Sequence, residues 1–222
     1  MAAGNRMRAD AQRNRAALLA AAKKVFGEHG LDAPLDDIAK RAGVGNATLY
    51  RRFPDRRELI WEVFADRMAD YLRAADHALT RADTWAAFVD YVAYLCELQA
   101  TDRGISELLT TTIVDVDDRL TRLRELGRER TAEVITRAQT PGGLRPDFTP
   151  QDFALLLMAN AGVVRRTTTY APEGWRRQLA FALDGLREAA ATAAPPPPSE
   201  AAMLAAMRLH RGPADQAAEP PR

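Results

Sequence analysis

The side chains best suited to chemistry lie in one short stretch, residues 46–53. In a helix over these residues, Leu49 and Phe53 fall on one face at i, i+4 spacing and face a core. The remaining surface then carries amide, hydroxyl and guanidinium groups, on Asn46, Thr48, Tyr50, Arg51 and Arg52. Such groups bond phosphates and base edges when a helix enters the major groove of DNA. The alternative is the solvated face of an ordinary helical hairpin.

The preceding residues have the spacing of a helix-turn-helix. Residues 35–42 predict a short helix with Ile38 and Ala42 on its inner face and the small Ala39 where two helices cross. Gly43 permits the positive φ of a tight turn, and Val44 then returns the chain to the core. The motif spans about residues 34–53.

No motif of an enzyme or a metal site occurs in the sequence. It contains no H-E-x-x-H, no P-loop and no G-x-S-x-G. The three histidines are far apart, a single Cys96 excludes a thiolate zinc cluster within one chain, and the acidic residues 115–118 lack an EF-hand series. We therefore expect no enzymatic activity, no cofactor and no metal.

The positive charge is concentrated at the N-terminus. Residues 1–57 contain 12 Lys and Arg against 6 Asp and Glu, whereas the rest contains 19 against 24. This asymmetry is typical of a small nucleic-acid-binding module on a neutral or acidic body. Neither a secretory signal nor an apolar stretch long enough to span a bilayer is present. We expect a cytoplasmic protein without a membrane partner.

The periodicity is helical almost throughout, and no alternating strand pattern occurs. Apart from the two short helices of the motif, helices are predicted up to His29 and over about 55–75, 85–100, 104–112, 117–139, 150–168 and 172–191. The fold class is therefore all-α. From Ala193 the composition shifts to proline and alanine, which predicts disorder. A short amphipathic helix capped by Ser199 is possible by pattern but is too short to be stable alone.

Residues 14–68 resemble the N-terminal domain of the TetR family of transcriptional regulators. The matching blocks are 21–30 (AAKKVFGEHG), 37–39 (DIA), 42–44 (AGV), 48–53 (TLYRRF) and 57–59 (REL). The resemblance implies that Tyr50 contacts phosphate, that Thr48 contacts phosphate or base, and that Asn46 reads a base. It places Arg51 and Arg52 against the DNA backbone.

Three further positions bear on this resemblance. Arg56 replaces the usual lysine at the start of the fourth helix, where charge and helix N-terminus both attract phosphate. Leu35 stands where a Thr or Ser usually bonds phosphate, so that contact is expected to be missing. Gly45 replaces a common Ser cap, which weakens the cap by a few tenths of a kcal/mol.

The resemblance also implies an architecture: a three-helix helix-turn-helix domain followed by a helical ligand-binding and dimerisation domain. We divide the chain into a flexible basic arm (1–12), the DNA-binding domain (13–60), the helical domain (61–192) and a disordered tail (193–222). The last two long helices are expected to form the dimer interface, through Trp175, Leu179, Leu183 and Leu186. The alternative is that this stripe packs within one chain.

Aromatic and small polar residues of the middle helices are the candidates for a ligand pocket. They are Met68, Tyr71, Trp85, Phe88, Tyr91, Tyr94, Thr111 and Asn160. Aromatic walls with few polar groups suit a drug-sized apolar molecule, although aromatic residues at helical spacing also form plain core. The expected protein is a repressor that binds a palindromic double-stranded DNA operator as a homodimer and is released by a small apolar effector. The alternative is a DNA-binding regulator whose C-terminal domain docks a protein partner.

Overall fold

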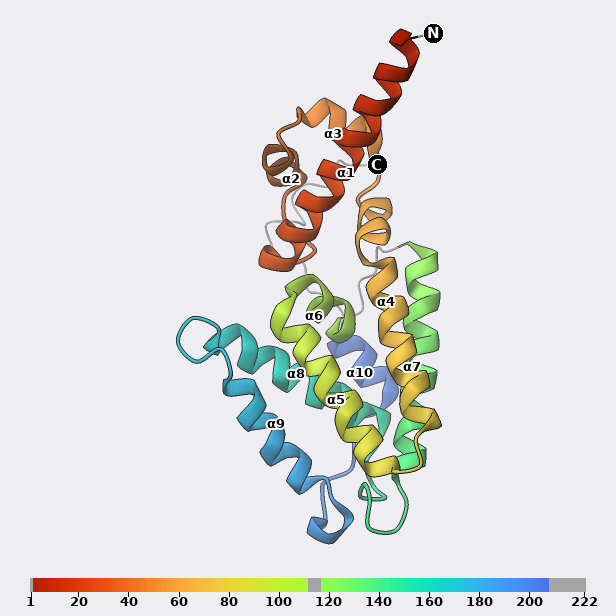
Figure 1. Ribbon diagram of the computed structural model, residues 1–222. Coiled ribbons are helices and arrows are strands. Elements are labelled where there is room, and N and C mark those ends of the chain that lie inside the picture. The colour runs from red at the N-terminus through yellow and green to blue at the C-terminus, as the bar shows by residue number, and fades with distance from the viewer. Residues whose placement is uncertain (1, 112–116, 208–222) are drawn as a thin grey trace.

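The computed structural model describes residues 2–111 and 117–207, with side chains from Asp10 onward (Figure 1). Within these ranges every named element is a helix and no strand occurs, which confirms the all-α class. The N-terminal part contains α1 (Ala2–His29), α2 (Leu35–Ala42) and α3 (Asn46–Arg52). The body contains α4 (Arg56–Thr80), α5 (Thr84–Thr101), α6 (Arg103–Thr110), α7 (Asp118–Ala138), α8 (Pro150–Thr167), α9 (Gly174–Gly185), the 3-10 turn η1 (Glu188–Ala190) and α10 (Glu200–Ala206).

Helices α1–α3 form a small domain at one end of an elongated molecule (Figure 1). Ile38 and Ala39 of α2 and Leu49 of α3 are fully buried together with the inner face of α1. Gly43 ends α2 with φ of 69°, and the Val44 N–H donates to the Ala39 carbonyl at 3.1 Å. A glycine is needed here because β-carbons disfavour positive φ. The predicted turn is confirmed.

The basic arm differs from the prediction. Helix α1 begins at Ala2, so most of the segment expected to be flexible is helical. Alanine, arginine, methionine and glutamine favour helices and no proline interrupts the first 29 residues. The apolar stripe that marks the helix in the sequence starts only at Leu18, so the pattern does not reveal the earlier turns.

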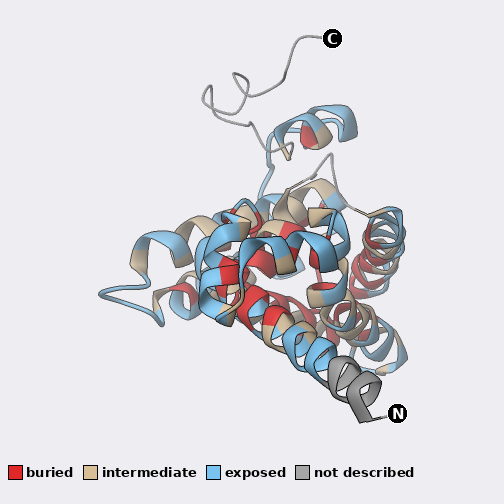
Figure 2. Ribbon diagram, turned by 90° about the horizontal axis from the view of Figure 1, so that it is seen from above, coloured by how far each residue is buried: buried red, intermediate tan, exposed pale blue. Residues whose placement is uncertain are grey.

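The body is a bundle in which α4 packs along α7 and α5, and α8 lies between α5 and α9. Buried residues concentrate on the helix faces that are turned toward one another (Figure 2). In the interior, the Tyr91 ring stacks on Tyr71 and on Phe153, with centroid separations of 6.3 and 6.0 Å. Helix α4 starts beside α3 and continues into this core, so one helix connects both parts.

Helix α6 joins the N-terminal domain to the body. The Leu31 N–H, in the turn after α1, donates to a Glu107 carboxylate oxygen at 2.7 Å, and the Leu31 carbonyl accepts from Arg56 at 2.6 Å. Asp102 caps α6 through the Ile105 N–H and lies 3.6 Å from the Arg67 guanidinium. These contacts fix the α1–α2 turn against α4 and α6.

The C-terminal segment also differs from the prediction. The chain from Ala193 was expected to be disordered, but Ser199 caps α10 by accepting from the Ala202 N–H at 3.2 Å. Met203 is buried against α8, with 6% of its surface exposed. A helix of this length is unstable alone; its packing on the body supplies the burial that composition does not reveal. Residues 208–222 lie outside the described part.

A candidate DNA-contacting helix and a cavity in the body

Helix α3 presents a polar surface because its apolar residues anchor it from behind. Leu49 and Phe53 are buried with 0% and 2% of their surfaces exposed, whereas Tyr50 is 49% exposed. Asn46, Arg51 and Arg52 are also exposed, and Thr48 is half-buried. Gly45 precedes the helix without a side-chain cap, in agreement with the sequence prediction. Five of the six predicted DNA-contacting residues therefore lie on or beside one accessible face.

The sixth residue, Arg56, occupies a different position. Its side chain is half-buried, and one guanidinium nitrogen donates to the Leu31 carbonyl. This bond holds the α1–α2 turn, so the group that was predicted to contact phosphate has a structural partner here. Its neighbour Arg57 is exposed and bonds the carboxylate of Asp55, which lowers the pKa of that carboxyl.

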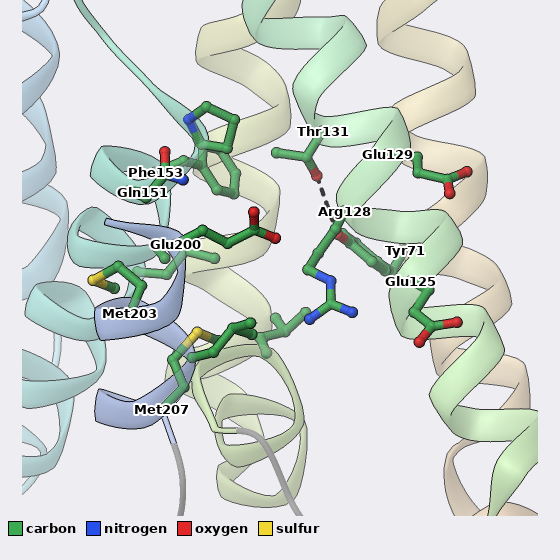
Figure 3. Close-up of a pocket in the computed structure, with 15 residues that line it drawn as sticks. Tyr71, Glu125, Arg128, Glu129, Thr131, Gln151, Phe153, Glu200, Met203 and Met207 are labelled. Carbon is green, nitrogen blue, oxygen red and sulfur yellow. Dashed lines mark hydrogen bonds between the residues drawn. The ribbon is translucent and has the colours of Figure 1, made fainter. Parts of the chain in front are cut away.

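A cavity of about 530 Å³ lies between α7, the start of α8 and α10 (Figure 3). This volume lies within the range of small-molecule sites. The apolar part of its wall consists of Leu109, Pro150, Phe153, Ala154, Leu157, Met203, Leu204 and Met207. The polar part consists of Tyr71, Glu125, Arg128, Glu129, Thr131, Gln151 and Glu200.

The predicted pocket residues divide between this wall and the core. Tyr71 lines the cavity, and Met68 lines a smaller hollow next to it. Phe88 and Tyr91 are buried in the core behind the wall, and Asn160 is a buried link that donates to the Gln99 amide oxygen at 2.8 Å.

Three other candidates lie away from the cavity. Trp85 packs against Phe88 and beneath the Arg187 guanidinium, and Tyr94 is a half-buried residue of α5. The carbonyl of Thr111 accepts a hydrogen bond from Arg124. Most of the predicted aromatic residues are therefore core residues, which is the alternative that the sequence left open.

A hydroxyl cluster stands between the cavity and the core. The Thr131 hydroxyl oxygen lies 3.1 Å from the Tyr71 hydroxyl and 2.8 Å from the Tyr91 hydroxyl, and it also donates to the Gly127 carbonyl. Because its proton is used on Gly127, its oxygen accepts from both tyrosines. Burial raises the pKa of both phenols, so they are neutral donors at ordinary pH.

The cavity residues that sequence reasoning missed come from α6, α7, α8 and α10. Arg128 projects from α7 into the cavity, and Glu200, Met203 and Met207 reach it from the opposite side (Figure 3). In the sequence, the Ser199 cap and the spacing of Met203 and Met207 predict a short amphipathic helix. This pattern does not show which surface of the body that helix covers.

The predicted dimer stripe, on α9 and at Leu186 just after it, packs largely within the single chain. Trp175 and Leu179 are buried within the chain, with 2% and 5% exposure, and Leu183 and Leu186 are half-buried against the same core. This is the packing that the sequence analysis gave as the alternative. The exposed large apolar residues of this region are Leu155 on α8, Phe181 on α9 and Tyr170 in the loop between them, at 44%, 61% and 94%.

The described residues offer neither a cluster of metal ligands nor an accessible thiol. No group of His, Cys, Asp and Glu side chains there is arranged to hold a metal ion. The single Cys96 is buried, and burial raises the pKa of its thiol to about 12. Among the described helices, none is long and apolar enough to cross a membrane.

Two family sequence models match the chain. The model described as "Bacterial regulatory proteins, tetR family" matches residues 18–63, and the model described as "Transcriptional regulator SbtR-like, C-terminal domain" matches residues 83–188. The first match contains α2 and α3, and the second contains most of the helices of the body.

The chain is also similar to characterised proteins. The HTH-type transcriptional repressor LfrR of Mycolicibacterium smegmatis is 33% identical over 141 residues, which cover 63% of this chain and 70% of LfrR. A crystal structure of LfrR from Mycobacterium smegmatis in complex with proflavine superposes with a TM-score of 0.53 at 24% identity, covering 82% of this chain and 98% of that one. FadR from Bacillus subtilis in complex with stearoyl-CoA gives a TM-score of 0.54 at 17% identity, covering 76% and 97%. At these identities, the two structures show a shared fold.

Proposed function

This chain belongs to the TetR family of DNA-binding transcriptional regulators, and we propose that it is a repressor that binds a palindromic operator as a homodimer. A small, largely apolar ligand bound in the body releases it from DNA. The observation that carries this proposal is the pairing of an exposed polar helix, α3, with a cavity in the body, both reached by α4.

For DNA, we infer that each subunit places α3 in a major groove. Tyr50, Arg51 and Arg52 supply a hydroxyl and two guanidinium groups on the exposed face, and Asn46 at the helix start supplies an amide. Phosphate contacts of this kind fix the register of the helix, and the amide can read a base edge. Half-sites one or more helical turns apart are expected for a two-fold dimer.

For the dimer, we infer an interface on the outer face of α8 and α9. Leu155 and Phe181 are large apolar residues that the chain leaves exposed, and a shallow hollow beside Phe181 is lined by Arg177, Gln178 and Ala182. Covering exposed apolar surface favours association. This surface replaces the Trp175–Leu186 stripe as the proposed interface.

For the ligand, the cavity between α7, α8 and α10 supports a small-molecule effector. Its wall is mostly apolar, and Tyr71 of α4 lies in it. The relative LfrR has been crystallised with a small molecule, proflavine. Because α4 also carries Arg56 and Arg57 next to α3, a ligand that displaces α4 would move the two DNA-contacting helices of a dimer.

Operator binding is the experiment that tests the proposal. DNA upstream of the gene should contain an inverted repeat that the purified protein retards in a gel shift. Replacing Tyr50 and Arg51 together by Ala should weaken binding by about 1–3 kcal/mol per half-site and leave the helical circular dichroism unchanged. Arg73→Ala, at an exposed position in the C-terminal half of α4 and therefore away from α3, is the control and should bind normally. Unchanged affinity of the double variant would refute the assignment of α3.

The second candidate is a DNA-binding regulator whose body docks a protein and senses no small molecule. The exposed Leu155 and Phe181 are the observation that favours it, because a partner protein could cover them as well as a second subunit could. In that case the purified protein is a monomer on its own, and no ligand changes its affinity for the operator.

A further inference from the structure

Among the described residues, Arg122, Arg124, Arg128 and Arg137 of α7 form no ion pair with an acidic side chain, and of these Arg124 and Arg128 lie beside the cavity. Arg119 pairs with Asp117 at 2.8 Å, and Arg130 pairs with Asp76 and Glu133 at 3.2 and 2.9 Å. Arg124 and Arg128 lie one turn apart, so their side chains are on the same side of the helix.

Arg124 is partly removed from water, whereas Arg128 is exposed on the cavity side. Arg124 is half-buried and donates to the Thr111 carbonyl. Burial, together with the smaller effect of the nearby Arg128 charge, lowers the pKa of Arg124 to about 10, and the group stays protonated at neutral pH. Like charges one turn apart are unfavourable, and removal from water adds to the cost. An anion beside them would relieve both effects.

The guanidinium of Arg128 points into the cavity, toward the space between α7 and α10 (Figure 3). The wall around that space is aliphatic and flexible, and it includes Leu109, Met203 and Met207. Methionine side chains adapt to irregular apolar ligands. The cavity therefore combines an apolar length of wall with the Arg128 guanidinium, and the carboxylates of Glu125, Glu129 and Glu200 also belong to its wall.

We propose that this cavity binds an amphipathic monocarboxylate, such as a fatty acid. The carboxylate meets the Arg128 guanidinium, and the alkyl chain lies against Phe153 and Leu157 of α8 and against the α10 methionines. This inference rests on the proposed function, because it names the chemical class of the effector.

Glu200 adds an internal competitor. Its carboxylate points from α10 across the cavity toward Arg128, without coming close enough to form an ion pair (Figure 3). Glu125 and Glu129 also line the cavity, but they point away from α10 in this view. A bound carboxylate thus approaches Arg128 against the negative charge of Glu200, so removing that charge should tighten binding.

Calorimetric titration of the full chain with decanoate, decanol and decylamine tests the proposal. The three probes share one alkyl chain and differ in the charge of the head group. Decanoate should bind at least about tenfold more tightly than decanol, because a charge-assisted hydrogen bond adds to the same apolar contact. Decylamine should bind most weakly. Equal affinities for decanoate and decanol, or tighter binding of decylamine, would overturn the proposal.

Variants locate the carboxylate within the cavity. Arg128→Gln should weaken decanoate binding about tenfold or more while leaving decanol binding unchanged, and Glu200→Gln should strengthen decanoate binding. The matched control is Arg122→Gln, an exposed arginine of α7 that does not line the cavity, and it should bind decanoate normally. Thermal melts confirm that the variants are folded. Normal decanoate binding by the folded Arg128→Gln variant would refute the site. The titrations contain no DNA, so their outcome is independent of whether the protein binds an operator.

Discussion

At the scale of single residues, Thr131 connects the ligand cavity to the core. Its hydroxyl joins tyrosines from two helices, Tyr71 of α4 and Tyr91 of α5, and it is bonded to its own backbone at Gly127. All three groups are buried, so a missing partner is not replaced freely by water. The cluster therefore fixes α7 against α4 and α5 at the inner wall of the cavity.

Removing this hydroxyl should destabilise the fold. Thr131→Val keeps the shape of the side chain but leaves the buried tyrosine hydroxyls without their shared acceptor, at an expected cost of about 1–3 kcal/mol in the free energy of unfolding. Urea denaturation measures the change. Thr136→Val, on the exposed side of the same helix, should change stability by no more than about 0.5 kcal/mol. Equal effects of the two substitutions would contradict this account of the cluster.

At the scale of elements, α10 shows how packing overrides composition. Its sequence is alanine-rich and follows four prolines, which by itself predicts no stable structure. In the folded chain, Met203 is buried against α8, and Leu204 and Met207 complete the cavity wall. Contact with α8 therefore stabilises α10, and α10 in turn covers apolar side chains of α8.

Docking of α10 should depend on Met203. Met203→Asp places a charge against the apolar surface of α8, which is unfavourable without a partner. The helix should then detach, and its amide hydrogens should exchange faster with solvent. Ala202→Asp changes the adjacent, exposed position of the same helix and should leave exchange slow. Fast exchange of α10 in the unmodified protein would show that the helix is not held by this contact.

At the scale of the whole molecule, the exposed apolar residues of α8 and α9 are the surface on which we propose that a second subunit packs. The side chains that were expected to form the interface, Trp175 and Leu179, already have partners inside the chain. Leu155 of α8 and Phe181 of α9, in contrast, are exposed in the single chain. A second subunit that covers them would bury both.

Charged substitutions should separate the subunits without unfolding them. Because Leu155 and Phe181 are exposed in the single chain, Leu155→Asp with Phe181→Asp should preserve helicity and yield a monomer in light scattering. Thr168→Asp with Thr169→Asp, at exposed positions just after the end of α8, adds the same two negative charges and serves as a charge-matched control for the apolar contact. A double variant of Leu155 and Phe181 that remains a dimer would place the interface elsewhere.

Coupling between the cavity and DNA is also a property of the whole molecule. Helix α4 begins next to α3 and carries Tyr71 in the cavity wall. Helix α6 carries Leu109 in the same wall, and its Glu107 accepts a hydrogen bond from Leu31 in the turn after α1. A ligand that prefers a displaced α4 should lower operator affinity about 5- to 150-fold, and the operator should lower ligand affinity by the same factor. Titrating decanoate, or a ligand found by thermal-shift screening, with and without operator measures this. Equal ligand affinity in both titrations would exclude release through these helices.

The sequence by itself determined the features that depend on neighbours along the chain. The i, i+4 spacing of Leu49 and Phe53 fixes which face of α3 is exposed, Gly43 fixes the turn before it, and helical periodicity with its breakers fixes the all-α class. These are local properties, because a helix repeats every 3.6 residues whatever surrounds it. The residues of the candidate DNA-contacting face were therefore predictable.

Only the tertiary structure decided which helix faces meet one another. The sequence places both Tyr71 and Tyr91 on apolar helix faces, but only Tyr71 lines the cavity. The space lies between α7 and α10, whereas the side of α5 that carries Tyr91 packs in the core. The same holds for Trp175, which faces inward, and for Met203, whose partner surface is about fifty residues earlier on α8. Periodicity specifies an apolar face, but the angle and neighbours of each helix specify whether that face meets core, ligand or a second subunit.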